Sequence, residues 1–541
     1  MSKPREAWAS RIGMILAVAG SAVGLGNFLR FPGNAAANGG GAFMIPYFCA
    51  LILLGIPICW AEWAMGKYGG QFGFNSCPAI FGVVGRRAIW RYLGVLGLLI
   101  PVVIYTYYVL IESWCLGYAV SFLFGWIDLG DDPTKFTEKS INYFNSFVGA
   151  NQDGLMLEGT LHISVVVWMI VFAVNFVVIF RGISRGIEWF CTYAMPLMAL
   201  CAFCVLIRVL TLGTPDPSQP NLNVINGLGF MWNPKPLDSD NASWYSALAQ
   251  PKVWMTAAGQ IFFSLSVGFG VIVNYSSYLK RKDDVVLSGL TASATNEFFE
   301  VCLGGLITIP AAFVFLGAAG ATQSGTFDLG FKTLPVVFEY MPGGRFFGCI
   351  WFLMLFLAAI TSSLSMLQPA IAFLEEALGL GRRGSVTLLG LITGLGSLFF
   401  IYFSKDLKAL LFVDDTIGNI TIVVLALVQT LLFAWVLGVR RGVQFAHEGA
   451  EMRLPFFFPF VIKYVTPVYL ILMLGLWAGY EFPKYYDLTM KDTVLKMSLG
   501  IVVLITVFLL IVIRIGGRRW QAENRDPRAV LAAPPHAGSS S

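Results

Sequence analysis

Side chains with neutral oxygen atoms recur inside apolar stretches of this chain, where such residues need a physical reason. Ala358, Thr361 and Ser362 stand at i, i+3 and i+4, so one helix face would present a carbonyl and two hydroxyls. Asn27 and Asn296 also lie within apolar runs. Such oxygens suit an alkali cation, and the sequence has no Cys, His and carboxylate set at transition-metal spacing. For a single Ser or Thr, a hydrogen bond to its own helix backbone is an equal alternative.

Ionisable side chains also interrupt the apolar runs. They are Arg30, Glu62, Glu112, Glu300 and the adjacent Asp414 and Asp415. Each such group costs roughly 2.5 to 3.5 kcal/mol on membrane-insertion scales, and groups retained at this cost usually mark a pathway for a substrate or an ion. Glu300 stands four residues after Asn296, one helical turn away, where its charge would offset a nearby bound cation.

Composition says what kind of scaffold must position these groups. Apolar residues make up 57% of the 541 residues and charged residues only 12%, which is typical of a membrane protein. The net charge of +5 comes from basic residues scattered over short connections rather than gathered in a stripe, so we exclude nucleic acid as a partner. The three histidines, His162, His447 and His536, lie outside the apolar centre, which argues against an enzyme.

The apolar runs predict twelve membrane-spanning helices. They cover residues 11–37, 41–70, 89–125, 160–181, 189–212, 251–277, 286–320, 345–377, 384–404, 408–438, 455–480 and 492–516. Basic residues cluster in alternate connections, and the remaining connections carry Asp and Glu. Because Lys and Arg favour the cytoplasmic side, we expect both termini in the cytoplasm and a multi-pass protein of the inner (plasma) membrane.

Two of these spans carry the same kind of interruption. Span 1 contains S-A-V-G-L-G at residues 21–26, and span 6 contains S-V-G-F-G at residues 266–270. Five spans separate the two, so the second unit is inverted relative to the first, which is the pattern of a secondary transporter's binding site. Small residues that only allow close helix packing are the alternative. Helices unwound here would offer carbonyls to a cation and N–H groups to a carboxylate.

Longer motifs carry a resemblance. The chain resembles the neurotransmitter:sodium symporter family, most closely its bacterial LeuT-like branch, in the segments AVGLGNFLRFP, NGGGAFMIPY, EWAMGKYGG, IESW, RGISRGIE, GQIFFSLSVGFG, LSGLTA, LGFKTLP and ITSSLSMLQPAIAFLEE. The match runs from about residue 5 to about residue 515. It implies an all-α integral membrane protein with the LeuT-type fold, in which twelve transmembrane helices include a 5+5 inverted repeat and helices 1 and 6 are unwound.

The resemblance divides the chain into five parts. These are a cytoplasmic N-terminal segment with inner-gate residues (1–10), the first inverted repeat (11–212), the second inverted repeat (251–438), the last two spans (455–516) and a disordered cytoplasmic tail (517–541).

The resemblance also implies two sodium sites beside a substrate site. The first sodium site would use Ala22, Asn27, Ser264 and Asn296, with the carboxylate of the substrate as a further ligand. The second would use Gly20, Val23, Ala358, Thr361 and Ser362. The substrate contacts would be Ala22, Gly24, Gly26, Ile104, Tyr108, Phe263, Ser264, Ser266, Phe269, Ser362 and Met366.

Two gates follow from the same resemblance. The outer gate would pair Arg30 with Asp414, with Tyr108 and Phe263 as the lid over the substrate. Because Asp415 adjoins Asp414, either acid fits the alignment. The inner gate would comprise Arg5, Trp8, Tyr278 and Glu376.

Two positions distinguish this chain within the family. Monoamine carriers have an aspartate where this chain has Gly24, and a glycine leaves room for the carboxylate of an amino acid. Chloride-dependent members have a serine where this chain has Glu300, beside Tyr47, Gln260, Ser264 and Asn296. We therefore expect a carboxylate in place of chloride, and hence no chloride requirement.

These arguments predict a sodium-coupled symporter of neutral, aliphatic or hydrophobic L-amino acids that works by alternating access. The alternatives are an amino acid sensor with a transporter-like fold, or a carrier of an aromatic amino acid, glycine or a betaine-like zwitterion. Ile104 and Met366 depart from the LeuT-like pattern and leave the preferred side chain open. Membrane lipid is an expected partner, and a homodimer remains open.

Overall fold

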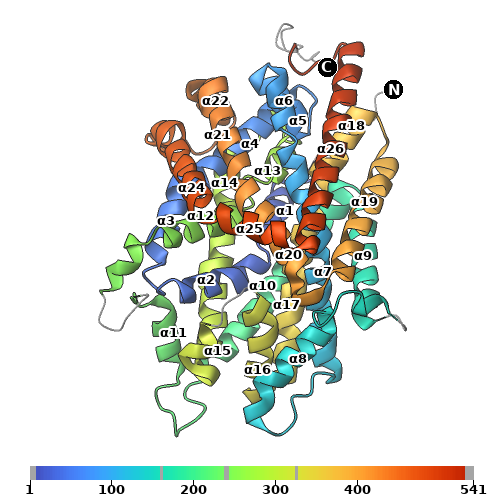
Figure 1. Ribbon diagram of the computed structural model, residues 1–541. Helices are drawn as coiled ribbons and strands as arrows, with labels where there is room; N and C mark the ends of the chain where they lie inside the picture. The colour runs from blue at the N-terminus through green and yellow to red at the C-terminus, as the bar shows by residue number, and fades with distance from the viewer. Residues whose placement is uncertain (1–7, 159–161, 237–242, 323–326, 530–541) are drawn as a thin grey trace.

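The computed structural model describes residues 8–158, 162–236, 243–322 and 327–529, and the regular elements in this part of the chain are all helical (Figure 1). Within it, ten helices are long and apolar enough to cross a membrane, and an eleventh span is a pair of helices bent by 49°. The C-terminal end of α26 lies at the same end of the molecule as α5, α6 and α22, as Figure 1 shows.

The first five spans and their connections are as follows. They comprise α1 (Arg11–Ala22), η1 (Gly26–Arg30), α2 (Phe31–Ala37), α3 (Met44–Ala50), η2 (Leu51–Gly55), α4 (Ile56–Gln71), α5 (Cys77–Gly85), α6 (Ala88–Leu93), α7 (Leu96–Phe124), η3 (Pro133–Lys135), α8 (Phe136–Val148), η4 (Leu155–Leu157), α9 (Ile163–Phe180), η5 (Ile183–Glu188) and α10 (Trp189–Leu210).

The next five spans repeat the pattern, and two more follow. They comprise α11 (Val224–Trp232), η6 (Trp244–Ala249), α12 (Pro251–Leu265), α13 (Val271–Ser276), α14 (Val286–Glu297), η7 (Phe298–Gly304), α15 (Gly305–Ala321), η8 (Asp328–Thr333), α16 (Leu334–Tyr340), α17 (Gly344–Met366), α18 (Gln368–Leu378), α19 (Arg382–Tyr402), η9 (Lys405–Leu407), α20 (Lys408–Val413), η10 (Asp414–Thr421), α21 (Ile422–Leu431), η11 (Leu432–Gly438), α22 (Val439–Ala446), α23 (Phe458–Phe460), η12 (Val461–Val465), α24 (Thr466–Tyr480), α25 (Phe482–Lys491) and α26 (Thr493–Ala522).

Span 1 breaks where the glycines predicted it. Helix α1 ends at Ala22, and Val23 takes an extended conformation with φ −72° and ψ 102°. The chain resumes as a π-helical turn, η1, from Gly26. The prediction of an unwound helix 1 is therefore confirmed.

Span 6 breaks more widely. Helix α12 ends at Leu265, and Ser266, Gly268 and Gly270 all have positive φ values, of 53°, 75° and 84°. Glycine adopts such values readily, whereas Ser266 does so at a steric cost. The two halves, α12 and α13, have 15 and 6 residues. Each half is too short to cross alone, which explains why eleven spans are counted where the sequence predicts twelve.

Helix α7 lies at the centre of the bundle and α26 at its periphery. The apolar window of the helix pair α6 and α7 is 94% buried, whereas that of α26 is 33% buried. Helix α17 packs along α7, and α1 packs against α10, α14 and α17. The broken part of span 1 is therefore enclosed by other helices and not exposed to lipid, which is where irregular backbone is tolerated in a membrane.

The predicted disorder from residue 517 is wrong for the first part of the tail. Helix α26 continues to Ala522, and Trp520 is buried with its indole N–H donating to the carbonyl of Glu376 at 3.1 Å. Its ring also packs edge-on against Phe74. A tryptophan with such partners orders the helix end that carries it. Residues 530–541 lie outside the described part.

Candidate ion and substrate site

The two helix breaks meet each other directly. The hydroxyl of Ser266 in the break of span 6 donates to the carbonyl of Ser21, at the end of α1, at 3.0 Å. On the other side of the first break, the side-chain oxygen of Asn27 accepts from the backbone N–H of Gly24 at 2.8 Å. The backbone groups released by the unwinding therefore find some of their partners across the break.

Oxygen atoms converge beside this contact. One terminal atom of the Asn296 amide lies 3.2 Å from the carbonyl oxygens of both Ala22 and Ser264 and 2.8 Å from the amide nitrogen of Asn27. As a nitrogen, it would donate to the two carbonyls. As an oxygen, it accepts from Asn27 and makes a group of three oxygens with no proton between them, which is the arrangement found around a cation. The residues predicted for the first sodium site thus lie together.

Glu300 is the charged group of this cluster. It lies on the π-helical turn η7 and is fully buried. Its carboxylate accepts from Gln260 at 2.8 Å, from Asn27 at 3.2 Å and from the hydroxyl of Ser264. Tyr47, expected beside Glu300, lies close enough to interact with it, and donates its hydroxyl hydrogen bond to the neighbouring carboxylate of Glu297 at 2.8 Å.

A second set of oxygens surrounds the hydroxyl of Ser362. This oxygen lies 3.2 Å from the carbonyl of Gly20, 3.4 Å from that of Val23 and 3.1 Å from that of Ala358. The hydroxyl has one proton and can donate to one of the three. The hydroxyl of Thr361 lies 3.1 Å from the same Ala358 carbonyl. The five residues predicted for the second sodium site therefore form one cluster, on α1 and α17.

Several of the predicted substrate residues lie close to one another beside the breaks. A Cβ added to Gly24 would lie 3.0 Å from the hydroxyl oxygen of Ser362 and 3.1 Å from that of Tyr108, and one added to Gly26 would lie 3.0 Å from Phe263. The rings of Phe263 and Phe269 are 6.2 Å apart, edge to face. The other predicted apolar contacts, Ile104 and Met366, are buried.

The outer gate is built differently from the prediction. Among the described residues, Arg30 donates to the side-chain oxygen of Asn419 and places its guanidinium 4.5 Å from the ring centre of Phe263. Asn419 in turn donates to Asp415 at 3.2 Å. Arg30 therefore reaches an acid through an amide, and that acid is Asp415.

Asp414 has a different partner. Its carboxylate accepts from the hydroxyl of Tyr107 at 2.7 Å. Asp415 accepts from the hydroxyl of Tyr485, in α25, at 2.9 Å. Arg30, Asp415, Asn419 and Tyr485 are among the residues lining a cavity of about 320 Å³ above the lid. In this conformation, the expected pair of Arg30 and Asp414 is replaced by two separate contacts.

The inner gate is described in part, because Arg5 lies outside the described residues. Trp8 donates its indole N–H to the carbonyl of Tyr275 at 3.1 Å. The amide of Gln368 donates to the hydroxyl of Tyr278 at 3.2 Å. Glu376 accepts from the backbone N–H of Asn75 at 2.5 Å and from the hydroxyl of Ser76 at 2.6 Å.

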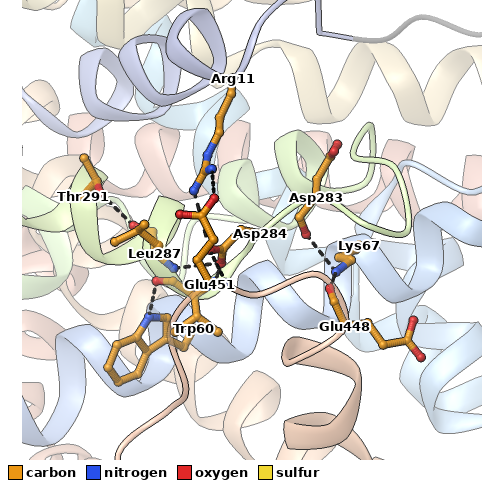
Figure 2. A network of polar contacts seen from close by, with 10 residues as sticks. Arg11, Trp60, Lys67, Asp283, Asp284, Leu287, Thr291, Glu448 and Glu451 are labelled. Atoms are coloured by element: carbon orange, nitrogen blue, oxygen red, sulfur yellow. Dashed lines mark hydrogen bonds and ion pairs between the residues drawn. The ribbon is translucent and has the colours of Figure 1, made fainter.

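A network of polar contacts lies beside the inner gate and connects several segments of the chain there (Figure 2). Arg11 at the start of α1 forms ion pairs with Asp284, at 3.5 Å, and with Glu451, at 2.6 Å. Asp284 also accepts from the backbone N–H of Glu451 at 2.9 Å. Lys67 donates to the carbonyls of Asp283, at 2.9 Å, and Glu448, at 2.7 Å. The connections after spans 6 and 10 are thereby joined to the start of span 1 and the end of span 2.

Sequence reasoning missed several partners in these contacts. They are Tyr107, Asn419 and Tyr485 at the outer gate, Asn75 and Ser76 at the inner gate, and Glu297 beside Tyr47. Asn419 stands one helical turn after Asp415, and that spacing was a usable signal. The other partners come from distant segments, and nothing in their local sequence indicates the contact.

A comparison with models of protein families identifies the family of the chain. The model of the sodium:neurotransmitter symporter family matches residues 5–128 and 127–518. The chain belongs to this family. It is therefore a sodium-dependent symporter by family, and the family is one of transporters rather than enzymes.

The relatives of this symporter include other sodium-dependent transporters. An uncharacterised one from Methanocaldococcus jannaschii is 28% identical over 86% of this chain and 89% of its own length. One from Haemophilus influenzae is 29% identical over 72% of this chain and 78% of its own. A third, from Bacillus subtilis, is 30% identical over 68% of this chain and 71% of its own.

A solved structure confirms the fold of the symporter. The crystal structure of MhsT in complex with L-phenylalanine superposes with a TM-score of 0.72 at 24% identity, covering 87% of this chain and 99% of MhsT. At this level of identity the likeness shows the fold alone, and it confirms the predicted LeuT-type architecture.

Proposed function

We propose that this symporter couples the movement of Na⁺ to the uptake of a neutral, aliphatic or hydrophobic L-amino acid. The observation that carries the proposal is the convergence of neutral oxygens at two places beside the broken helices. One group gathers around the Asn296 amide and the other around the Ser362 hydroxyl. Groups of uncharged oxygens of this kind suit alkali cations. We therefore assign two sodium sites, one to each group.

The space between the breaks suits the charged end of an amino acid. The half-helix that begins at Gly26 turns its N-terminal, positive end toward the break, where it favours a carboxylate. Gly24 faces Ser362 and Tyr108 at such short range that a side chain there would occupy this space. The substrate carboxylate would complete the coordination at the first sodium site, so each ligand would strengthen the binding of the other.

The surroundings of Glu300 support transport without chloride. A buried carboxylate here already accepts hydrogen bonds from Gln260, Asn27 and Ser264. The same donors would surround a chloride ion if the carboxylate were absent. Glu300 therefore supplies the negative charge that offsets a cation at the first site.

The gates support alternating access. Substrate binding would order Tyr108, Phe263 and the Arg30 contacts above the site, and the unit of spans 1, 2, 6 and 7 would then rock to open the opposite side. A ligand shifts this equilibrium only by its difference in affinity between the two states. The rocking unit would have to release the contacts of Trp8 and Arg11 at its inner-gate end. We place those contacts and both termini in the cytoplasm of a bacterial cell.

Uptake into proteoliposomes tests the proposal. With an inward sodium gradient, the reconstituted protein should accumulate leucine, alanine or methionine, and replacing sodium by potassium should abolish accumulation. Equal uptake in potassium would contradict sodium coupling. Saturable binding without any uptake would favour the sensor instead.

Competition by all common amino acids would then rank the substrates. Displacement of labelled leucine by aliphatic amino acids supports the proposed class. Stronger displacement by an aromatic amino acid, by glycine or by a betaine would assign the other zwitterion class.

A further inference from the structure

A second cavity lies far from the transport site, at the end of the molecule that carries α5, α22 and the last turn of α26. Its volume is about 210 Å³, and its lining includes Tyr68, Arg86, Val436, Leu437, Arg441 and Phe445. These residues come from the end of α4, the residue after α5, the end of η11 and the helix α22. Helix α5 packs against η11, and α22 packs against α4, so four segments form its wall.

The two arginines of this cavity differ from other cations at this end of the molecule in their contacts. Neither Arg86 nor Arg441 has an ion pair or a side-chain hydrogen bond within the part of the chain that the structure describes, and both act electrostatically on the hydroxyl of Tyr68. Nearby cations differ, since Arg281 pairs with Glu448 at 2.9 Å and Lys67 donates to two carbonyls. Two guanidiniums that share a cavity without an acid between them repel each other unless an anion is bound.

The remaining wall of the cavity is apolar. Val84 is buried, whereas Val436 is 39% exposed on the outer surface of span 10. Leu437 continues this surface at the helix end. A cavity with cations on one side and lipid-facing aliphatic side chains on the other matches an amphiphile rather than a free ion.

Backbone geometry sets the position of Arg86. This residue caps the end of α5 in the left-handed conformation, with φ 55° and ψ 5°. For a non-glycine residue this conformation carries a steric cost, because its Cβ crowds the following carbonyl oxygen. The turn directs the chain from α5 into α6 and leaves the Arg86 side chain on the cavity.

We propose that this cavity binds the phosphate of an anionic phospholipid from the leaflet at this end of the molecule. Guanidinium groups bind phosphate oxygens through paired, charge-assisted hydrogen bonds. Arg86 and Arg441 take the phosphate, the hydroxyl of Tyr68 is an additional donor, and the acyl chains lie along Val436 and Leu437. Basic pockets between spans at the cytoplasmic face are a known mode of headgroup recognition.

Native mass spectrometry of the full-length protein tests the proposal. Phosphatidylglycerol or phosphatidylcholine is added to protein purified in detergent, and retained lipids are counted. The double variant Arg86→Gln/Arg441→Gln should bind phosphatidylglycerol at least tenfold more weakly at one site. The matched control is Arg87→Gln/Arg440→Gln, which removes the same charge from equally exposed adjacent positions outside the cavity lining and should bind like the wild type.

Further measurements distinguish an anionic phospholipid from free phosphate and from a zwitterionic lipid. Excess inorganic phosphate should leave phosphatidylglycerol bound, and phosphatidylcholine should not occupy the site. The variant Arg86→Lys/Arg441→Lys keeps the charge without the paired donors and should bind with intermediate affinity. For the wild type alone, phosphatidylglycerol should raise the melting temperature more than phosphatidylcholine does. Equal loss in the control, no loss in the double variant, displacement by phosphate or no selective rise in melting temperature would each overturn the proposal.

Discussion

At the scale of single residues, Asn27 connects three features of the site. Its oxygen holds the unwound backbone at Gly24, and its nitrogen reaches both Glu300 and Asn296. The position of the helix break, the buried carboxylate and the cation ligands therefore depend on one amide. Removing any one member leaves buried donors or acceptors unpaired, and each unpaired group costs about 1–3 kcal/mol.

Replacing Glu300 by serine should make transport depend on chloride. The substitution leaves the donors of Gln260, Asn27 and Ser264 around an empty space without negative charge. In sodium gluconate, uptake by Glu300→Ser should fall at least tenfold, equivalent to about 1.4 kcal/mol, and chloride should restore it. Wild-type uptake should be the same in both media. A wild type that loses uptake in gluconate would refute the role given to Glu300.

Replacing Thr361 by valine should weaken sodium activation. Valine keeps the shape of threonine and removes the hydroxyl that lies beside the Ala358 carbonyl. The sodium concentration for half-maximal uptake should rise several-fold, and the sigmoidal dependence should become shallower. The matched control is Thr393→Val in α19, whose hydroxyl, like that of Thr361, bonds to carbonyls of its own helix, but which lies on neither α1 nor α17, the helices that carry the cluster. An equal change in both variants would contradict the assignment of Thr361 to the second sodium site.

Some of these residues were predictable from sequence and others were not. Asn27, Asn296 and Thr361 are unusual in apolar runs, and their spacing indicates which faces they share. Tyr107 and Tyr485 resemble dozens of other aromatic residues in the chain, and only the packed structure brings them to Asp414 and Asp415. The link from Arg30 to Asp415 through Asn419 depends on side-chain reach, which spacing does not specify.

At the scale of elements, the two breaks have different physical causes. Span 1 breaks over the three residues between α1 and η1, where Val23 is extended and Leu25 is already helical. Span 6 needs three residues with positive φ in the five between α12 and α13. Backbone crowding is tighter there, since a Cβ on Gly270 would lie 2.4 Å from the carbonyl oxygen of Gly97. The second break is therefore the more sensitive to substitution.

Replacing Gly270 by alanine should damage the fold of span 6. The positive φ of 84° alone costs an alanine roughly 1–2 kcal/mol, and the clash with Gly97 adds to this. We expect a lower melting temperature of the purified protein and loss of uptake. The control is Gly259→Ala in α12, where a Cβ meets nothing within 4 Å. Similar melting temperatures for the two variants would contradict the strained hinge.

Hydropathy predicted the elements well and their ends poorly. Apolar runs locate the spans because each must bury about 20 residues in lipid. The tail shows the limit of this signal, since α26 extends to Ala522 through a polar sequence. Its end is stabilised by the contacts of Trp520 with Glu376 and Phe74, which lie far away along the chain.

At the scale of the whole molecule, the network in Figure 2 joins two connections to the ends of two helices, α1 and α4, at one end of the bundle. Asp284 is its centre, because its side chain is 2% exposed and accepts from the backbone N–H groups of Val286 and Leu287 at the start of α14. Glu451 lies at the edge, with its side chain 63% exposed. Burial, more than the number of ion pairs, decides how much each residue contributes to the stability of the folded protein.

Replacing Asp284 by alanine should therefore destabilise the protein more than replacing Glu451. Asp284→Ala removes the cap of α14 and leaves buried N–H groups unpaired, at a cost of about 1–3 kcal/mol. Glu451→Ala removes an exposed ion pair, worth about 1 kcal/mol or less. Thermal unfolding of the two purified variants at low and high salt measures the difference. A reversed order would show that the exposed pair, and not the buried cap, holds this end together.

The position of the short helix α25 has a consequence for the evolution of transport rate and selectivity. Its Tyr485 donates to Asp415, which is linked through Asn419 to Arg30 of span 1. Helix α25 itself lies between the last two spans, outside the unit of spans 1, 2, 6 and 7 that is expected to rock. The last two spans are thus connected to the outer-gate contacts through a single hydroxyl group. Substitutions in this surface helix can therefore change how often the outer gate opens without altering the residues that contact the substrate. Turnover rate and substrate selectivity can then change independently of each other among homologous chains.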